Sequence, residues 1–132
     1  MPRLSALLAL AVLAPAARAA EPTPEQLEFF EKQVRPVLVE KCVGCHGPEK
    51  QKGGLRLDTR DGALAGGDRG PALVPGKSKD SLLLRAVRHA DEELKMPAAK
   101  LPDRDILALE KWVELGAPWP AKVTLAPPGD IA

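Results

Sequence analysis

The sequence predicts an all-α domain of three to four helices around a long middle loop rich in glycine and proline. Apolar residues recur at helical spacing in three segments, near residues 24–41, 78–89 and 102–115. Glycine and proline interrupt residues 47–76 so often that nothing longer than one helical turn, near 61–65, fits there. No stretch shows the pattern of parallel strands. With 132 residues, the chain has room for one domain with a modest core.

The first helix is expected to begin with a capping box. Thr23 is a suitable N-cap, Pro24 fits the first helical position, and Gln26 stands where the partner of the box belongs. Pro36 falls inside the helical pattern, so we expect it to kink the helix or split it in two. The second piece, residues 37–41, leads directly into the cysteines.

The later helices are bounded by similar signals. Ser78 is a candidate N-cap for the middle helix, and Pro102 stands at the first turn of the last helix, which Gly116 ends. The sequence therefore predicts a domain over residues 20–120. Residues 121–132 are expected to form a proline-rich tail or linker without a core of its own.

Residues 1–19 have the pattern of a secretory signal peptide. Arg3 precedes an apolar run over residues 4–14, and a small-residue cleavage site lies near Ala19. This run is too short to cross a bilayer of about 30 Å comfortably, although an uncleaved anchor is the alternative. We expect the mature chain to be periplasmic or otherwise exported, with no membrane span.

Charge and aromatic content narrow the function classes. Loss of Arg3 and Arg18 with the leader leaves 17 basic and 18 acidic residues, a net charge of −1, which gives no basic field for binding nucleic acid. Only four aromatic residues are present: Phe29, Phe30, Trp112 and Trp119. So few large side chains predict a thin core, which a flat, apolar cofactor would fill.

Both cysteines of the chain lie in the run K-C-V-G-C-H-G, residues 41–47. A redox disulfide normally follows a strand of a βαβ unit, and a structural disulfide here would close only a very small loop. Neither uses His46. A zinc site would have to use every cysteine and histidine of the mature chain, and their spacing matches no usual zinc pattern.

The pattern Cys-X-X-Cys-His is typical of c-type haem attachment. On a helix, Cys42 and Cys45 would lie on one face and could form thioethers with the two vinyl groups of one porphyrin. His46 would then bind the iron as the proximal ligand. The sequence therefore predicts one covalent haem c, with its iron, in a small cytochrome c-like fold. Attachment outside the cytoplasm agrees with the predicted export.

Met96 is the expected distal iron ligand. It is the only methionine left after the leader, and it lies in a turn before Pro97 rather than on a helix stripe. A thioether ligand would favour reduced iron. Two alternatives stay open: Met96 as core filler, and His89 as the ligand. Five arginines could meet the haem propionates: Arg56, Arg60, Arg69, Arg85 and Arg88.

Several motifs together resemble the planctomycete-type cytochrome c domain over roughly residues 25–120. They are F-F-E-K-Q-V-R-P-V-L-V-E-K-C-V-G-C-H-G, G-G-L-R-L-D-T-R, G-G-D-R-G-P-A-L-V-P-G, S-L-L-L-R-A-V, K-M-P and A-L-E-K-W-V-E-L-G-A-P-W-P. The resemblance implies a mono-haem, mostly helical cytochrome with His46 and Met96 as axial ligands. In that family the domain often stands at the N-terminus of a longer exported protein. The family usually continues K-M-P-P, whereas Ala98 stands at that position here.

We therefore expect an electron carrier and no enzyme, since nothing in the sequence forms a nucleophile–base pair. Single electrons would pass between redox protein partners, or through this relay module to a downstream enzymatic domain. The alternative is a haem-based sensor or small catalytic haem protein, in which the sixth ligand is open or displaceable.

Overall fold

The computed structural model describes residues 9–11 and 21–127. They form α-helices, one π-helical segment and two short 3-10 turns, and no strand occurs among them. In chain order the elements are α1 Pro24–Phe29, the π-helical segment Phe30–Val34, α2 Arg35–Lys41, a 3-10 turn Lys52–Gly54, α3 Arg60–Ala65, a 3-10 turn Ser78–Asp80, α4 Leu82–Val87 and α5 Asp103–Glu114. The all-α class is confirmed for these residues. The signal peptide predicted at 1–19 lies outside them, apart from 9–11.

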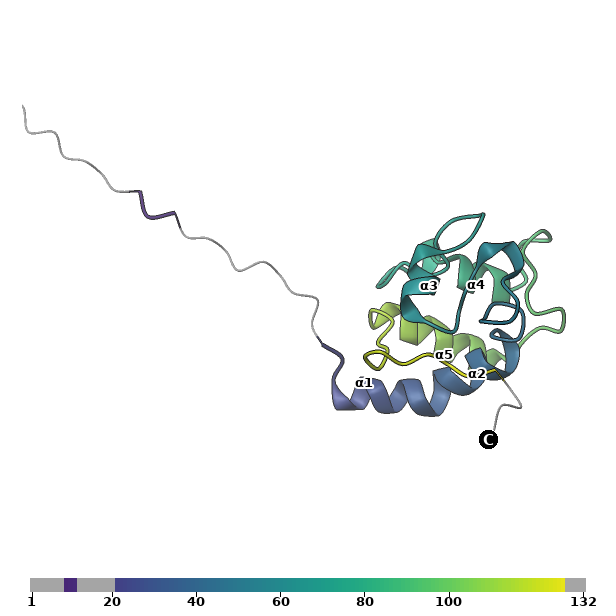
Figure 1. Cartoon of the computed structure of the whole chain (residues 1–132), viewed down its shortest axis with the longest axis horizontal. Coiled ribbons are helices and arrows are strands. Elements are labelled where there is room, and N and C mark those ends of the chain that lie inside the picture. Colours follow the sequence, from purple (N-terminus) through teal and green to yellow (C-terminus); the bar gives the residue numbers. More distant parts are fainter. Residues whose placement is uncertain (1–8, 12–20, 128–132) are drawn as a thin grey trace, which may run out of the picture.

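The N-terminal rod has the predicted cap and the predicted break. Thr23 Oγ1 accepts the Gln26 N–H at 3.2 Å, and the Gln26 side chain accepts the Thr23 N–H at 3.1 Å. Pro36 has no N–H to continue the α-helical ladder, and a π-helical turn directly precedes α2. Figure 1 shows α1 and α2 continuing one another along the lower edge, with α5 beside them.

An aromatic cluster joins this rod to the C-terminal half. Phe30 lies 4.9 Å from Trp119 and 6.0 Å from Trp112 between ring centroids, and all three side chains are buried. The Trp112 indole N–H donates to Pro118 O at 2.8 Å, and the Trp119 indole N–H donates to Val123 O at 2.9 Å. Buried indoles of this kind fix the chain that supplies the carbonyl. The core therefore extends beyond α5.

The segment after α5 packs on the domain as far as the structure describes it. Leu125 is fully buried, and its N–H donates to Asp58 O at 2.7 Å. Residues 121–127, predicted as part of a linker, therefore contribute to the core of the domain. The boundary proposed at Pro120 coincides with no change in packing, because Trp119 and Leu125 on either side of it are both buried.

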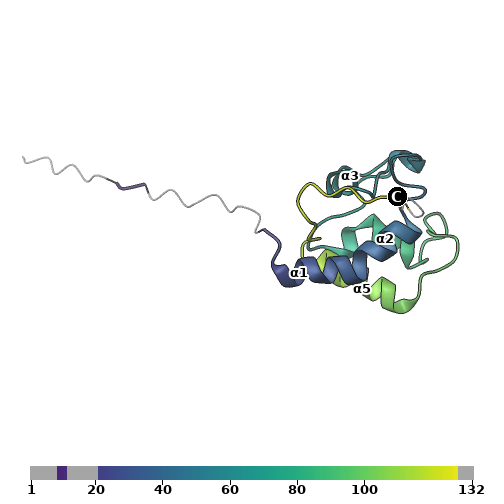
Figure 2. The same ribbon diagram turned by 60° about the horizontal axis from the view of Figure 1, so that its bottom comes forward.

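The middle of the chain is irregular, as predicted, with α3 as its one α-helical turn. Its Gly-rich turns pack backbone to backbone: a Cβ on Gly67 would overlap Gly53 O, and Asp68 N–H donates to that same carbonyl at 2.8 Å. Figure 2 shows α3 on the opposite side of the domain from α1 and α5. The expected cap at Ser78 was wrong, because α4 begins only at Leu82.

The last helix agrees with its prediction. Its buried face consists of Ile106, Ala108, Leu109, Trp112 and Val113. Among residues 9–11 and 21–127, no helix is both long and apolar enough to cross a membrane.

Candidate functional site

The Cys-X-X-Cys-His motif forms a turn directly after α2, not a part of the helix as expected. The N–H groups of Cys42 and Val43 both donate to Leu38 O, at 3.0 and 2.9 Å, which closes the helix. The next turn then winds around the Cys42 carbonyl, which accepts the N–H groups of Cys45 at 3.2 Å and His46 at 3.0 Å. This turn brings the backbones of the three candidate residues together.

The returning middle loop holds the motif from its other side. Lys52 N–H donates to Cys45 O at 3.0 Å, and Leu57 N–H donates to His46 O at 2.7 Å. The residue after the histidine is also constrained, since a Cβ on Gly47 would overlap Val43 O. Sequence reasoning assigned no role to Gly47. The only sequence signal that could have marked Gly47 as constrained is its position directly after His46.

The two thiols differ in their surroundings. Cys42 is buried, Cys45 is exposed, and no disulfide joins them. Burial raises the pKa of the Cys42 thiol from 9.0 to about 12, with a smaller contribution from the nearby Cys45. Because the thiolate is the form that exchanges disulfides, this environment disfavours redox chemistry at Cys42.

His46 carries a polar atom without a partner. Its ring Nδ1 is buried and makes no hydrogen bond to any described residue. A buried, unsatisfied nitrogen costs about 1–3 kcal/mol, so a histidine in this state is suited to a ligand that satisfies the ring. No group of three or more His, Cys, Asp or Glu side chains that could hold a metal ion occurs within residues 9–11 and 21–127.

This donor set fits a haem. The porphyrin supplies the equatorial iron ligands, so the protein has to contribute only one or two axial side chains. Two free thiols and one histidine ring with an unpartnered nitrogen lie in one turn, which supplies the residue types that attach a haem and bind its iron.

Met96 lies in the turn between α4 and α5, outside the buried cluster that contains Cys42. Its side chain is 48 % exposed, so it is not core filler. Its N–H donates to Ala86 O at 3.1 Å. The rival ligand, His89, uses its Nε2 in a 2.7 Å hydrogen bond with Pro97 O. This bond would have to break if His89 bound iron through Nε2.

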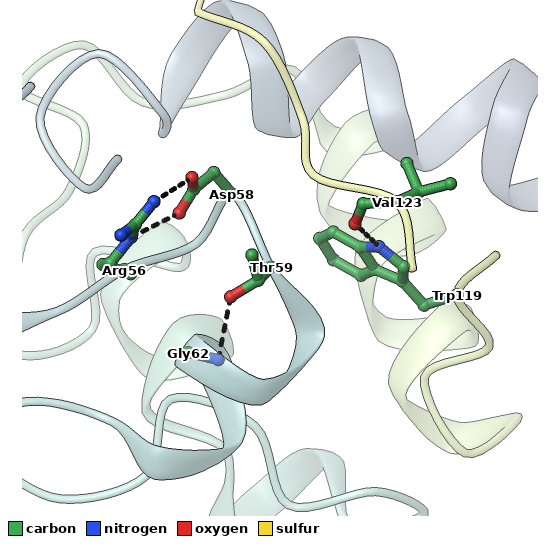
Figure 3. Close-up of polar contacts among 6 residues, drawn as sticks. All are labelled: Arg56, Asp58, Thr59, Gly62, Trp119 and Val123. Atoms are coloured by element: carbon green, nitrogen blue, oxygen red, sulfur yellow. Dashed lines mark hydrogen bonds and ion pairs between the residues drawn. The ribbon is translucent and has the colours of Figure 1, made fainter. Parts of the chain in front are cut away.

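Four of the five arginines named above already have partners. Arg56 donates two hydrogen bonds to the buried Asp58 (Figure 3), and Arg60 donates to Ala117 O and Gly116 O. Arg85 and Arg88 form ion pairs with acidic side chains. For Arg69, the structure shows no such contact within residues 21–127.

Two surface hollows lie away from the motif. One, of about 350 Å³, is formed by the start of α3 and residues 119–124. The other, of about 370 Å³, lies between the N-terminal rod and α5. Neither is lined by the cysteines, His46 or Met96, so neither belongs to the candidate site.

Comparison with known families found one match to the segment that holds the motif. Residues 42–99 match the family model described as Planctomycete cytochrome C. This segment of the chain is therefore similar to planctomycete-type cytochrome c domains. The matched segment includes both cysteines, His46 and Met96. The aromatic cluster lies outside the matched segment, since Phe30 belongs to the N-terminal rod, Trp112 to α5 and Trp119 to the chain after α5. No curated protein and no solved structure matched the chain.

Proposed function

We propose that the protein is an exported, mono-haem c-type cytochrome that passes single electrons between redox partners. The observation that carries the proposal is the partnerless buried nitrogen of His46 in the turn that also holds the two free cysteines. When bound, the haem supplies an iron that cycles between its ferric and ferrous states.

In this proposal the cysteines attach the cofactor. The S–H groups of Cys42 and Cys45 would each add across one vinyl double bond of the porphyrin, so that sulfur and hydrogen would end on its two carbons. No atom leaves and no oxidant is required. The high pKa of Cys42 keeps its thiol protonated before attachment. His46 would bind the iron as the proximal ligand, and the hydrogen bonds of its N–H and C=O groups hold its backbone in place.

Met96 is the distal ligand in this proposal. Its thioether would stabilise ferrous iron, while its backbone is already fixed by Ala86. Because no motif for a second haem exists in the sequence, one electron is carried at a time. The export rests on the signal peptide at residues 1–19. The partners are redox proteins, or a downstream enzymatic domain served by this relay.

A second function is favoured by one observation. Met96 is half exposed and lies in a turn, so a small molecule could displace it. The protein would then be a haem-based sensor or a small catalytic haem protein with an accessible sixth position.

The decisive experiment expresses the full chain with its leader in cells that have a haem-attachment system. Covalent haem that survives acid–organic extraction, in a periplasmic fraction, is the expected result. A weak long-wavelength ferric band that is lost in Met96→Ala, together with inertness to carbon monoxide, supports the carrier. Rapid binding of carbon monoxide by the unaltered protein supports the sensor. Absence of covalent haem contradicts both.

Variants separate the two attachment residues. Cys42→Ala and Cys45→Ala should each keep one thioether, and the double variant should release its haem on extraction. Gly44→Ala is the matched control within the motif, because a Cβ at Gly44 would meet no atom within 4 Å.

A further inference from the structure

His89 ends α4 in a conformation that is unusual for its residue type. It lies just beyond the C-cap Arg88 with φ of 55°, in the left-handed region. Glycine is the usual residue at this position of a helix, because a Cβ is unfavourable there. Among residues other than glycine, histidine is one of those that adopt this conformation more often, so His89 can keep it while its side chain points to another segment.

The side chain of His89 reaches the loop that carries Met96. Its Nε2 lies 2.7 Å from Pro97 O. A carbonyl oxygen only accepts, so Nε2 is the donor and the imidazole carries its proton there. The bond spans the gap between the end of α4 and the returning limb of the turn.

A second anchor holds the same segment through the backbone. Ala86 O accepts two N–H groups, from His89 at 3.2 Å and from Met96 at 3.1 Å. The N–H of Met96 is therefore held by Ala86 O, and the carbonyl of the following residue, Pro97, is held by the His89 ring. The thioether projects from the residue between these two anchors, where it is 48 % exposed.

The first half of the turn is held differently. Asp91 accepts the Leu94 N–H through its backbone at 3.0 Å and the Glu93 N–H through its side chain at 3.0 Å. It also pairs with Arg85 at 3.1 Å. None of these contacts reaches Pro97, so the described residues give its carbonyl only the His89 partner.

We propose that His89 is a positioning residue that sets the direction of the Met96 side chain and keeps the thioether available to the iron. The inference rests on the proposed role of Met96 as distal ligand. It assigns His89 to the support of the ligand and not to the iron, since its Nε2 is already engaged. Without the imidazole, Pro97 O loses its hydrogen bond and only the Met96 N–H bond to Ala86 O remains. The methionine would then leave the iron more often.

The test compares His89→Gly with His89→Gln in the haem-loaded protein. Glycine relieves the left-handed conformation and removes the side chain, so His89→Gly should melt no lower than the unaltered protein. It should nevertheless bind imidazole about three- to tenfold more tightly, as expected when loss of one hydrogen bond weakens methionine ligation. Gln keeps an N–H donor, and His89→Gln should recover part of the difference.

A haem-free readout completes the test. Hydrogen exchange at the Met96 amide should be faster in His89→Gly than in the unaltered haem-free protein, with α5 unchanged. Equal imidazole affinity and equal exchange would overturn the positioning role. If the unaltered protein shows no long-wavelength ferric band, the proposed ligand Met96 fails instead, so the two failures are distinguishable. Should His89→Gly unfold, His89→Asn, which also tolerates the left-handed region, replaces it.

Discussion

Gly47 packs against Val43 so closely that a Cβ at its position would overlap the Val43 carbonyl oxygen and lie 2.9 Å from Val43 Cγ1. The two residues flank the Cys45–His46 pair, and Val43 itself is buried. The turn that presents His46 therefore depends on a residue without a side chain directly after it.

Gly47→Ala should destabilise the domain by about 1–3 kcal/mol, since the turn must shift to accommodate a methyl group. Covalent haem attachment should fall as well, because the shift moves His46. Gly44→Ala, in the same turn but with open space around its Cβ, should change stability by less than about 0.5 kcal/mol. Urea unfolding of both haem-free variants measures the difference. Equal effects would show that the Val43 contact does not constrain the motif.

The two cysteines should react at very different rates before haem is attached. With a pKa of about 12, only about 10⁻⁴ of Cys42 is thiolate at pH 8. Iodoacetamide should therefore modify the exposed Cys45 at least about a hundredfold faster, and Cys42 only after local opening. Peptide mass spectrometry of the haem-free protein follows both sites. Comparable rates would mean that Cys42 is not buried in solution.

The same pKa predicts a loss of stability in alkali. The Cys42 thiol ionises near 9.0 when exposed and near 12 in the fold, so above pH 9 the unfolded chain holds fewer protons than the native one. The free energy of unfolding should fall as pH rises between these values, by about 1.4 kcal/mol per pH unit from this group. Subtracting the pH profile of haem-free Cys42→Ala isolates the contribution. A flat difference contradicts the prediction.

Leu125 tests whether the tail belongs to the domain. It is fully buried beyond the predicted boundary, so Leu125→Ala should cost about 2–5 kcal/mol. Leu107 on α5 is 63 % exposed, and Leu107→Ala should change stability by less than about 0.5 kcal/mol. Thermal unfolding of both variants gives the comparison. A neutral Leu125→Ala would restore the domain end at Pro120.

Local sequence signals predicted several features of the helices. The capping box at Thr23 and Gln26, the break at Pro36 and the apolar face of α5 all depend on residues a few positions apart, and each is present in the structure. The Cys-X-X-Cys-His motif, likewise local, lies in the matched family segment.

Contacts between distant residues could not be predicted in the same way. The burial of the tail depends on Leu125 reaching Asp58, and the Met96 turn depends on His89 reaching Pro97. No periodicity or spacing marks such pairs. The helical piece ends at Lys41 as predicted, but the cysteines, expected on a helix, lie in a turn, because the N–H groups of Cys42 and Val43 share Leu38 O.

The ion pair of Arg56 with Asp58 allows a test of how the buried Asp58 carboxylate is stabilised where Leu125 packs on the domain. Asp58 is fully buried and receives hydrogen bonds from Arg56 Nε at 2.9 Å and Nη2 at 2.6 Å, while its own carbonyl holds Leu125 (Figure 3). Arg56→Met leaves a buried carboxylate without its cation and should clearly destabilise the haem-free domain.

Arg56→Met combined with Asp58→Asn removes that charge and should be more stable than Arg56→Met alone. Arg85→Met is the matched control, since its partner Asp91 is 34 % exposed and such pairs contribute about 0–1 kcal/mol. Chemical unfolding of these three variants and of the unaltered chain gives the comparison. If the double variant is no more stable than Arg56→Met, the cost arises from lost packing of the arginine side chain and not from the unpaired carboxylate.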